Sequence, residues 1–324
     1  MSDTTRCHFV PKFHLKNFLQ DGSKVLWVYD RGTFAIKAQL PKDTAVIVDY
    51  YIAKDLTGKK NKFVEHLLSE IEGKAKASID QIIKDPKSIT IEDITSIKLF
   101  LAFMHCRVPN SVRMVEEVYL AGVDSLLDDL TKIAKDPIKS RQHYGEFIKS
   151  GKAARDISYE EYCATLLIPK NKFAIKIDEK HSIGGSLILS EEVFKRMMVM
   201  NMSVDIHKGD NFFITSDTPL NVFCATGKNQ AIFGSGFGLM AVELSFPITP
   251  KICIRLCYKE KKGVKYINSA YVDEINKRMI AGSQRYVISP FKSNRINKMI
   301  KKLASYYKRP IIDIEEMKKR LNNI

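Results

Sequence analysis

Two histidines stand within a short apolar segment near the start of the chain, in the pattern His8-x-x-Pro11-x-x-His14. Proline fixes its own φ angle and restricts the preceding residue to extended geometry, so Pro11 predicts a rigid turn close behind His8. An imidazole held in a fixed position can act as general acid or base near neutral pH. His8 is therefore the candidate catalytic histidine. The alternative is that the segment only anchors the terminus, with His8 bonding a backbone carbonyl.

Two carboxylates, Glu65 and Glu72, lie seven positions apart in a segment of helical periodicity. Seven residues are close to two turns, so both side chains project from one face of the predicted helix. Such a pair can bind a metal ion or share proton transfer. On a lysine-rich helix the same pair can also be solvated, and both interpretations stay open from the sequence.

Two further charged residues stand where predicted elements end. Arg107 closes an apolar helical pattern just before Pro109, where it can clamp a phosphate or only interact with the helix dipole. Asp217 follows Ser216 at the end of a strand-like run that stops at Pro219. This carboxylate is either displayed at a site or used to form the turn.

The segments that must position these residues change type along the chain. Apolar alternation predicts a β-hairpin around residues 30–32 and a short strand at 45–49, and helical periodicity follows. The predicted helices are 61–84, 90–108, 111–134, 158–168 and 190–200. The predicted later elements are strands at 204–207, 211–215, 239–246, 251–258, 264–267 and 286–288, a helix at 273–282 and one or two basic terminal helices.

Helices and strands are segregated in this order, which predicts an α+β fold with an N-terminal β-hairpin, a central helical block and a C-terminal antiparallel sheet with terminal helices. We expect one domain over residues 1–290, with a helical insertion at about 60–200 and a β-rich part at about 203–290. Residues 291–324 would form a basic helical tail. The early strands are expected to join the late sheet.

Composition limits the classes of protein that the chain can belong to. Of its 324 residues, 45% are hydrophobic and 27% charged, as in ordinary globular proteins. No apolar run is long enough to span a bilayer, no signal peptide is visible at the start, and the six cysteines are scattered. These features predict reduced thiols, a cytoplasmic location and no membrane partner.

The net charge of +15 favours an anionic partner such as RNA or DNA. Residues 291–324 carry ten basic against three acidic residues, and tyrosines lie between the basic ones. This pattern suits phosphate contacts combined with base stacking, although a solvated amphipathic helix has the same pattern. The predicted nucleic-acid-binding residues are Lys298, Lys301, Lys302, Tyr306, Tyr307, Lys308 and Arg309.

Over roughly residues 6–290 the chain resembles a bacterial family labelled as a domain of unknown function. Its members open with H-x-V-P-x-x-Y-L-x-x-F and carry R-x-P at a helix end and an F-I-T-S-D-x-P strand and turn. The matching residues are His8, Val10, Pro11, Leu15, Phe18, Glu65, Glu72, Arg107, Pro109, Thr215, Ser216, Asp217, Pro219, Pro247, Thr249, Pro250, Asn276 and Arg285. This chain departs from the pattern at His14, where tyrosine is usual, and at Ile248, where leucine is usual.

The resemblance implies that His8, Arg107 and Asp217 converge in space. It also implies supporting roles for Glu65, Glu72, Ser216, Asn276 and Arg285. Some similar proteins are associated with bacterial defence against phage, which implies such a role here by analogy only.

Three hypotheses follow for the function. The leading one is an RNase-like effector in which His8 transfers a proton, Arg107 stabilises phosphate charge and Asp217 orients the histidine or holds a metal ion. The second is a non-catalytic module that binds a nucleotide or a protein. The third is a phosphohydrolase in which Glu65, Glu72 and Asp217 hold Mg²⁺ or Mn²⁺. The histidine scheme requires no cofactor, and the oligomeric state is left open.

Overall fold

The computed structural model describes residues 4–54, 58–151, 156–168, 172, 175–224 and 236–304. They divide into two compact units, one within Met1–Arg113 and Glu179–Ile311 and the other within Met114–Asp178. The α+β class is confirmed, because strand pairs, a helical block and an antiparallel-rich sheet follow one another along the chain. The domain boundaries drawn from the sequence stay a prediction.

The N-terminal segment of the first unit contains short strands and one-turn helices. The predicted hairpin is confirmed, because β2 and β3 pair antiparallel with Val28 opposite Lys37. The predicted strand at 45–49 is also confirmed, and it pairs with residues that directly precede Pro11. The elements are β1 (Arg6–His8), α1 (Lys12–Lys16), β2 (Leu26–Asp30), β3 (Ile36–Gln39), η1 (Pro41–Asp43), β4 (Val46–Val48), β5 (Ala53–Lys54) and β6 (Lys60–Asn61).

Three long helices of this unit follow the predicted periodicity, with one correction. Thr90 caps α3 through a capping box with Asp93, as its sequence predicts. Ser190 was expected to begin a helix, but it lies inside α7, where its hydroxyl bonds the carbonyl of Leu187 instead of capping. The helices are α2 (Phe63–Lys84), α3 (Ile91–Arg107) and α7 (Glu179–Met198).

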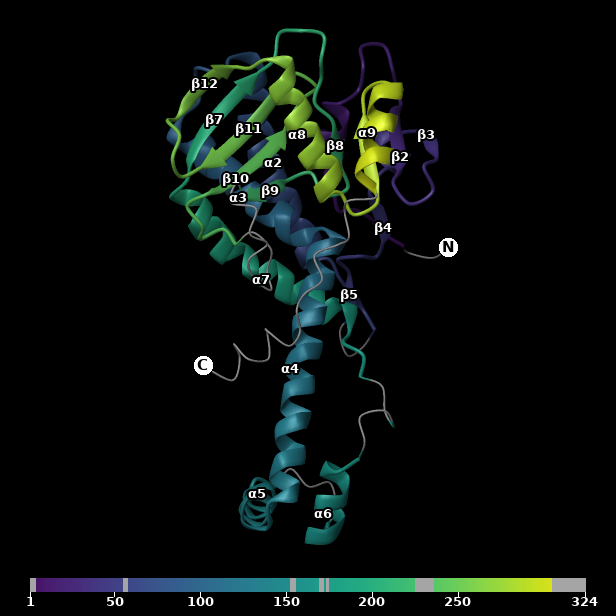
Figure 1. The fold of residues 1–324 in the computed structure, drawn as a ribbon, viewed down its shortest axis with the longest axis vertical. Helices are drawn as coiled ribbons and strands as arrows, with labels where there is room; N and C mark the ends of the chain where they lie inside the picture. The colour runs from purple at the N-terminus through teal and green to yellow at the C-terminus, as the bar shows by residue number, and fades with distance from the viewer. Residues whose placement is uncertain are drawn as a thin grey trace. The chain divides into compact units, whose positions relative to one another are not determined.

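A five-stranded sheet in the order β12-β7-β11-β10-β9 forms the centre of the unit. In Figure 1, α8 lies in front of this sheet and α2 and α3 lie behind it. The strands are β7 (Asn201–Ile206), β9 (Asn221–Cys224), β10 (Val242–Pro247), β11 (Ile252–Cys257) and β12 (Gly263–Tyr266), and α8 spans Ser269–Gly282.

The prediction of a hairpin between residues 204–207 and 211–215 is wrong. Strand β7 pairs with β11 and β12, and residues 212–214 pair instead with other partners. The side-chain amide of Asn276 bonds the amide of Ile214 and the carbonyl of Phe212, and the amide of Phe213 bonds the carbonyl of Pro250. Long-range partners therefore override the turn signal of the local sequence.

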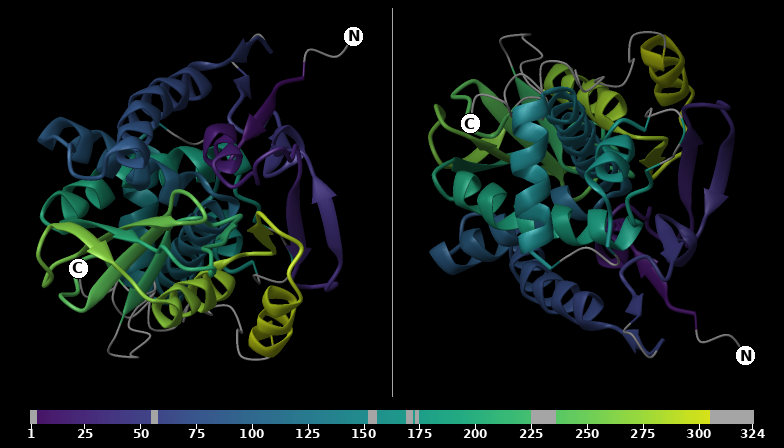
Figure 2. Two further views of the ribbon diagram at one scale, coloured as in Figure 1. Left: turned by 90° about the horizontal axis from the view of Figure 1, so that it is seen from above. Right: turned by 90° about the horizontal axis from the view of Figure 1, so that it is seen from below.

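A second sheet of four strands, in the order β3-β2-β13-β8, confirms that early strands join late ones. One face of β2 packs on α9, where Tyr29 lies in a buried cluster with Ile296 and Ile300. Figure 2 shows this helix in yellow near the purple N-terminal strands. The remaining elements are β8 (Thr215–Ser216), β13 (Tyr286–Ser289) and α9 (Asn294–Ala304).

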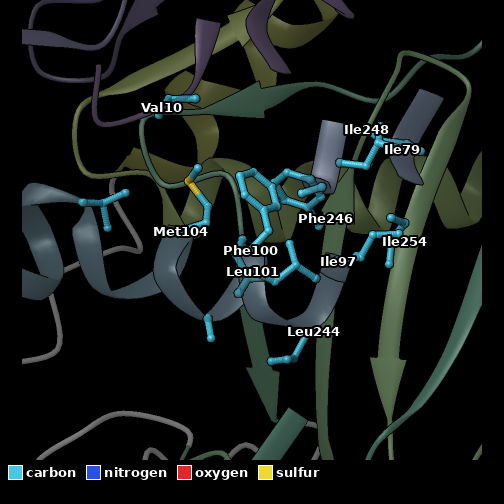
Figure 3. Packing of buried hydrophobic residues seen from close by; sticks show 14 of the residues in the cluster. Val10, Ile79, Ile97, Phe100, Leu101, Met104, Leu244, Phe246, Ile248 and Ile254 are labelled. Atoms are coloured by element: carbon cyan, nitrogen blue, oxygen red, sulfur yellow. The ribbon is translucent and has the colours of Figure 1, made fainter. Parts of the chain in front are cut away.

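The main core lies between α3 and the inner face of the five-stranded sheet. Phe100 of α3 meets Phe246 of β10 edge to face, with ring centroids 5.9 Å apart, and Leu101 and Leu244 are fully buried nearby. Figure 3 shows these residues with Val10, which joins the N-terminal segment to the same core. Burial of this surface is the main free energy that holds the site's elements in place.

The second unit consists of helices. Its elements are most of α4 (Pro109–Lys135), α5 (Pro137–Lys149) and α6 (Tyr159–Leu166). Helix α5 was not predicted, although Asp136 caps it and Pro137 occupies its first turn. The Ser158 capping box begins α6 as expected. Tyr144 donates to the carbonyl of Ile157 at 2.6 Å and thereby joins α5 to the start of α6.

Candidate functional site

Arg107 is the centre of the first cluster of predicted site residues. Its side chain is 2% exposed, and its guanidinium donates to the carbonyls of Phe9 (2.9 Å) and His8 (2.7 Å) and to Glu72 Oε1 (2.6 Å). Tyr51 in turn donates to the carbonyl of Arg107 at 3.1 Å. The end of α3 is therefore tied to the N-terminal segment by one buried cation, and each terminal nitrogen of that cation already has an acceptor.

Glu65 and Glu72 lie on the same side of α2 and both interact with Arg107. Glu72 forms the direct ion pair, whereas Glu65 is half-buried and shares a hydrogen bond with the Cys7 thiol. Burial raises the pKa of Glu65, and the Cys7 hydrogen bond and the Arg107 charge act in the opposite direction. The cluster consists of one cation and two carboxylates, of which one keeps a raised pKa.

His8 lies at the edge of this cluster and is partly exposed. Strand β1 pairs with β4, which places His8 opposite Val46, and its Nε2 lies 3.4 Å from the carbonyl of Pro41. Burial lowers the pKa of His8, while that carbonyl and Glu72 act to raise it. A neutral imidazole near pH 7 can accept a proton, so a base role for His8 stays a prediction.

Asp217 belongs to a second cluster, at the start of β13. Its carboxylate is 4% exposed and accepts from the amides of Gln284 (2.8 Å), Arg285 (2.7 Å) and Tyr286 (2.8 Å). Burial raises the pKa of Asp217 to about 6, and these three amides act to lower it. The side chain thus closes the turn into β13 and leaves little of its carboxylate free.

The other residues carried over from the resemblance also have partners inside the fold. Ser216 is buried against Met279 and accepts from the amide of Thr218. Asn276 bonds the backbone on either side of Phe213, as described above. Arg285 is 57% exposed and pairs with Asp30 at 2.8 Å. These contacts position the strands β8 and β13, and a direct role in chemistry remains a prediction.

Of the three residues expected to converge, His8, Arg107 and Asp217, the first two are in direct contact. Arg107 holds the backbone of His8, so these two lie together. Among the described residues, no hydrogen bond or ion pair joins the side chain of either one to Asp217. Nor does that part of the chain bring three histidine, cysteine or acidic side chains together in a way that could hold a metal ion.

A cleft of about 680 Å³ lies beside the second cluster. The cleft is enclosed by the β2–β3 hairpin, the segment from η1 to β4 and the start of β13. Phe9 also lines it. Phe9 also receives the Arg107 hydrogen bond through its carbonyl, so it connects the first cluster to the cleft. The charged and amide side chains that line the cleft include those of Asp30, Lys37, Asp43, Asp217, Gln284 and Arg285.

The predicted basic residues are described only in part. Helix α9 exposes Lys298, Lys301 and Lys302, while Ile296 and Ile300 point into the core. A shallow hollow of about 400 Å³ lies along it, lined in part by Lys298 and Lys302. Tyr306, Tyr307, Lys308 and Arg309 lie outside the described residues.

Several polar residues of the fold were missed by the sequence reasoning. Cys7 and Tyr51 also belong to the Arg107 cluster, through hydrogen bonds to Glu65 and to the carbonyl of Arg107. In the sequence they are marked only by their position beside predicted elements. Arg255 and Asp205 form a buried ion pair at 2.9 Å on adjacent strands of the large sheet. Each of these two was one charge in an apolar strand, so only the register of β7 against β11 could have paired them.

Comparison with known proteins gives a family but no function. The model of a family described as "Protein of unknown function (DUF4238)" matches residues 6–293. No curated protein and no solved structure matches the chain. Within the described residues, no helix has the length and apolar character needed to cross a membrane.

Proposed function

The chain belongs to the DUF4238 family of proteins of unknown function, and we propose that it binds nucleic acid through the exposed basic face of α9. The observation that carries this proposal is the separation of charge and apolar surface on that helix. Ile296 and Ile300 are 3% and 1% exposed, whereas Lys298 and Lys301 are exposed and have no ion-pair partner among the described residues. Helix α9 contains no acidic residue.

An aromatic ring lies beside a lysine close to the start of α9. Lys292 lies directly before α9, and its Nζ is 5.4 Å from the centre of the Trp27 ring. Trp27 is partly exposed. Cations that follow a helix face beside an aromatic ring suit a backbone of phosphates and a stacked base, and phosphate contacts supply most non-specific affinity.

Two contacts favour binding over cleavage by the predicted histidine site. Arg107 would have to release two backbone carbonyls and Glu72 before it could meet a phosphate. Asp217 would have to release three amides before it could orient a histidine. We therefore place nuclease activity second, and the role in anti-phage defence rests on resemblance alone.

Fluorescence anisotropy with labelled single-stranded RNA and DNA tests the proposal on the full chain. We expect saturable binding that weakens as KCl rises. In the double variant Lys298→Gln/Lys301→Gln the slope of log K against log salt should decrease by about 0.7 for each lost phosphate contact. The matched control is Lys84→Gln/Lys87→Gln, which removes two exposed lysines where α2 ends.

Equal affinity and equal salt slope in the α9 variant and its control would overturn the proposal. The same samples are run on gels for cleavage. RNA cleavage by the wild type that disappears in His8→Ala would replace the binding module by the histidine nuclease. Binding without cleavage in both proteins supports the proposal as stated.

A further inference from the structure

We propose that the cleft beneath the β2–β3 hairpin binds a nucleoside monophosphate, at a site separate from the nucleic-acid surface on α9. The cleft volume of about 680 Å³ lies within the range of small-molecule sites, about 300–1,000 Å³. All of its lining residues belong to one compact unit.

The floor of the cleft is apolar. Val28 pairs with Ile288 across β2 and β13, and cross-strand partners share a face of the sheet. Both residues line the cleft together with Phe9. Ile288 is fully buried, whereas Val28 and Phe9 keep 6% and 8% of their surface exposed. A flat apolar body such as a nucleobase can lie against this small exposed apolar surface.

The unpaired polar groups of the cleft are suited to an anion with a hydrogen-bonding ring. Lys37 stands opposite Val28 on the neighbouring strand, which places its side chain on the floor side, and it is exposed without a partner among the described residues. The side-chain amide of Gln284 likewise has no partner there. A lysine offers a phosphate a compact positive charge, and an amide can both donate to and accept from the edge of a base.

Each carboxylate that lines the cleft has partners of its own. Asp30 pairs with Arg285, and Asp43 pairs with Arg6 at 2.7 Å. Asp217 keeps its charge when it is ionised, but its two oxygens accept from three backbone amides. Lys37 is a cation of the cleft without an ion-pair partner among the described residues, and one cation suits one phosphate group better than a chain of phosphates.

The backbone around the cleft is held in an uncommon conformation. Ala45 lines the cleft with a φ of 55°, and Phe34, between the lining residues Thr33 and Ala35, has a φ of 58°. Left-handed residues other than glycine cost free energy and cluster at functional sites. The carbonyl of Ala45 accepts from the amide of Phe9, so the strained segment is fixed to the wall of the cleft.

The hairpin separates this site from the surface proposed for nucleic acid. Val28 and Lys37 face the cleft, whereas Tyr29 and Ile36 face α9 in the second buried cluster. A change on one face can therefore be made without changing the other. This alternation lets the two proposals be tested independently.

Isothermal titration of the full chain with AMP, adenosine and inorganic phosphate tests the site. We expect AMP to bind more tightly than adenosine, by about tenfold for one charge-assisted hydrogen bond. Lys37→Gln should weaken the binding of AMP by that factor and leave the affinity for adenosine unchanged. Ala35→Phe, which fills the cleft without changing a charge, should abolish binding of both.

The α9 variant Lys298→Gln/Lys301→Gln is the matched control and should bind AMP like the wild type. Circular dichroism and the melting temperature establish that each variant is folded. Absence of saturable AMP binding at millimolar concentration would overturn the proposal. An unchanged preference for AMP over adenosine in Lys37→Gln would also overturn it, whatever the result for nucleic acid.

Discussion

At the scale of single residues, Arg107 shows that a residue with the chemistry for catalysis also holds elements of the fold together. A lone arginine at the end of an apolar helix has the chemistry to clamp phosphate. Here the same donors satisfy the carbonyls of His8 and Phe9, which would otherwise be buried without partners. Replacing it therefore changes stability first.

We predict that Arg107→Met destabilises the protein by about 3 kcal/mol or more, because it leaves buried carbonyls and Glu72 without their donor. Glu72→Gln should cost clearly less, since Glu72 is 25% exposed and the two carbonyl hydrogen bonds remain. Urea unfolding of both variants and of the double variant measures the two costs and their coupling. Equal costs for the two single variants would show that the ion pair alone accounts for the effect of Arg107.

Asp217 leads to a prediction about pH. Burial raises its pKa to about 6 from an ordinary 3.8, so the folded protein holds this proton more tightly than the unfolded chain. The resulting stabilisation is fully present below about pH 3.8 and is lost as pH rises through about 6. Between pH 4 and 7 the stability of the wild type relative to Asp217→Asn should therefore fall by roughly 3 kcal/mol.

Urea unfolding at several pH values measures this difference, and the subtraction removes the titration of all other groups. Carbon-13 NMR of the Asp217 carboxyl measures the pKa directly. Parallel stability curves for the two proteins, together with a midpoint below pH 4, would show that the three amides outweigh burial.

At the scale of elements, the local sequence predicted the end of an element correctly where residues close to that end form the capping contacts. The Thr90 hydroxyl accepts from the amide of Asp93 at 3.1 Å, and the Asp93 carboxylate accepts from the amide of Thr90 at 2.9 Å. Both contacts lie within four residues, so the sequence alone specifies the start of α3. Ser190 has the residue type of a cap, but α7 continues through it, and its buried hydroxyl bonds the carbonyl of Leu187.

We predict that Thr90→Ala lowers the free energy of unfolding by about 1 kcal/mol, because an unpaired amide is left at the start of α3. The control is Thr95→Ala in the same helix. The Thr95 hydroxyl only bonds the carbonyl of Ile91 at 2.8 Å, a contact that does not help a helix. Thermal melts compare the two, and a control that loses as much stability as Thr90→Ala would refute the role of the cap.

At the scale of the whole molecule, the net charge of +15 is not spread evenly over the described surface. Some basic residues are paired inside the fold and add nothing to this excess, as in the buried pair of Arg255 with Asp205. Part of it is displayed on α9, where no acidic residue of the helix offsets it. Net charge favours the anionic partner that we propose, and the tertiary structure shows that the α9 lysines are exposed.

The sequence by itself determined the fold class, the early hairpin, most helices and the strands from β10 to β13. These features depend on periodicity and on contacts between near neighbours. It also determined that Glu65 and Glu72 share a face of one helix, because that follows from helical geometry. Their common partner is 35 residues beyond Glu72 and could not be found from spacing.

Only the tertiary structure decided the partners of residues 212–214, the hydrogen-bond partners of Arg107 and Asp217 and the existence of the cleft. Each depends on strands that meet across long stretches of chain, such as β2 with β13, and register is set by burial of one face against the core. The pattern along the sequence therefore predicts a catalytic set, whereas in the folded structure the side chains of Arg107 and Asp217 hydrogen-bond to the backbone of other elements. The functional proposals rest on four residues whose side chains have no partner within the described parts of the chain: Lys37 and Gln284 in the cleft and Lys298 and Lys301 on α9.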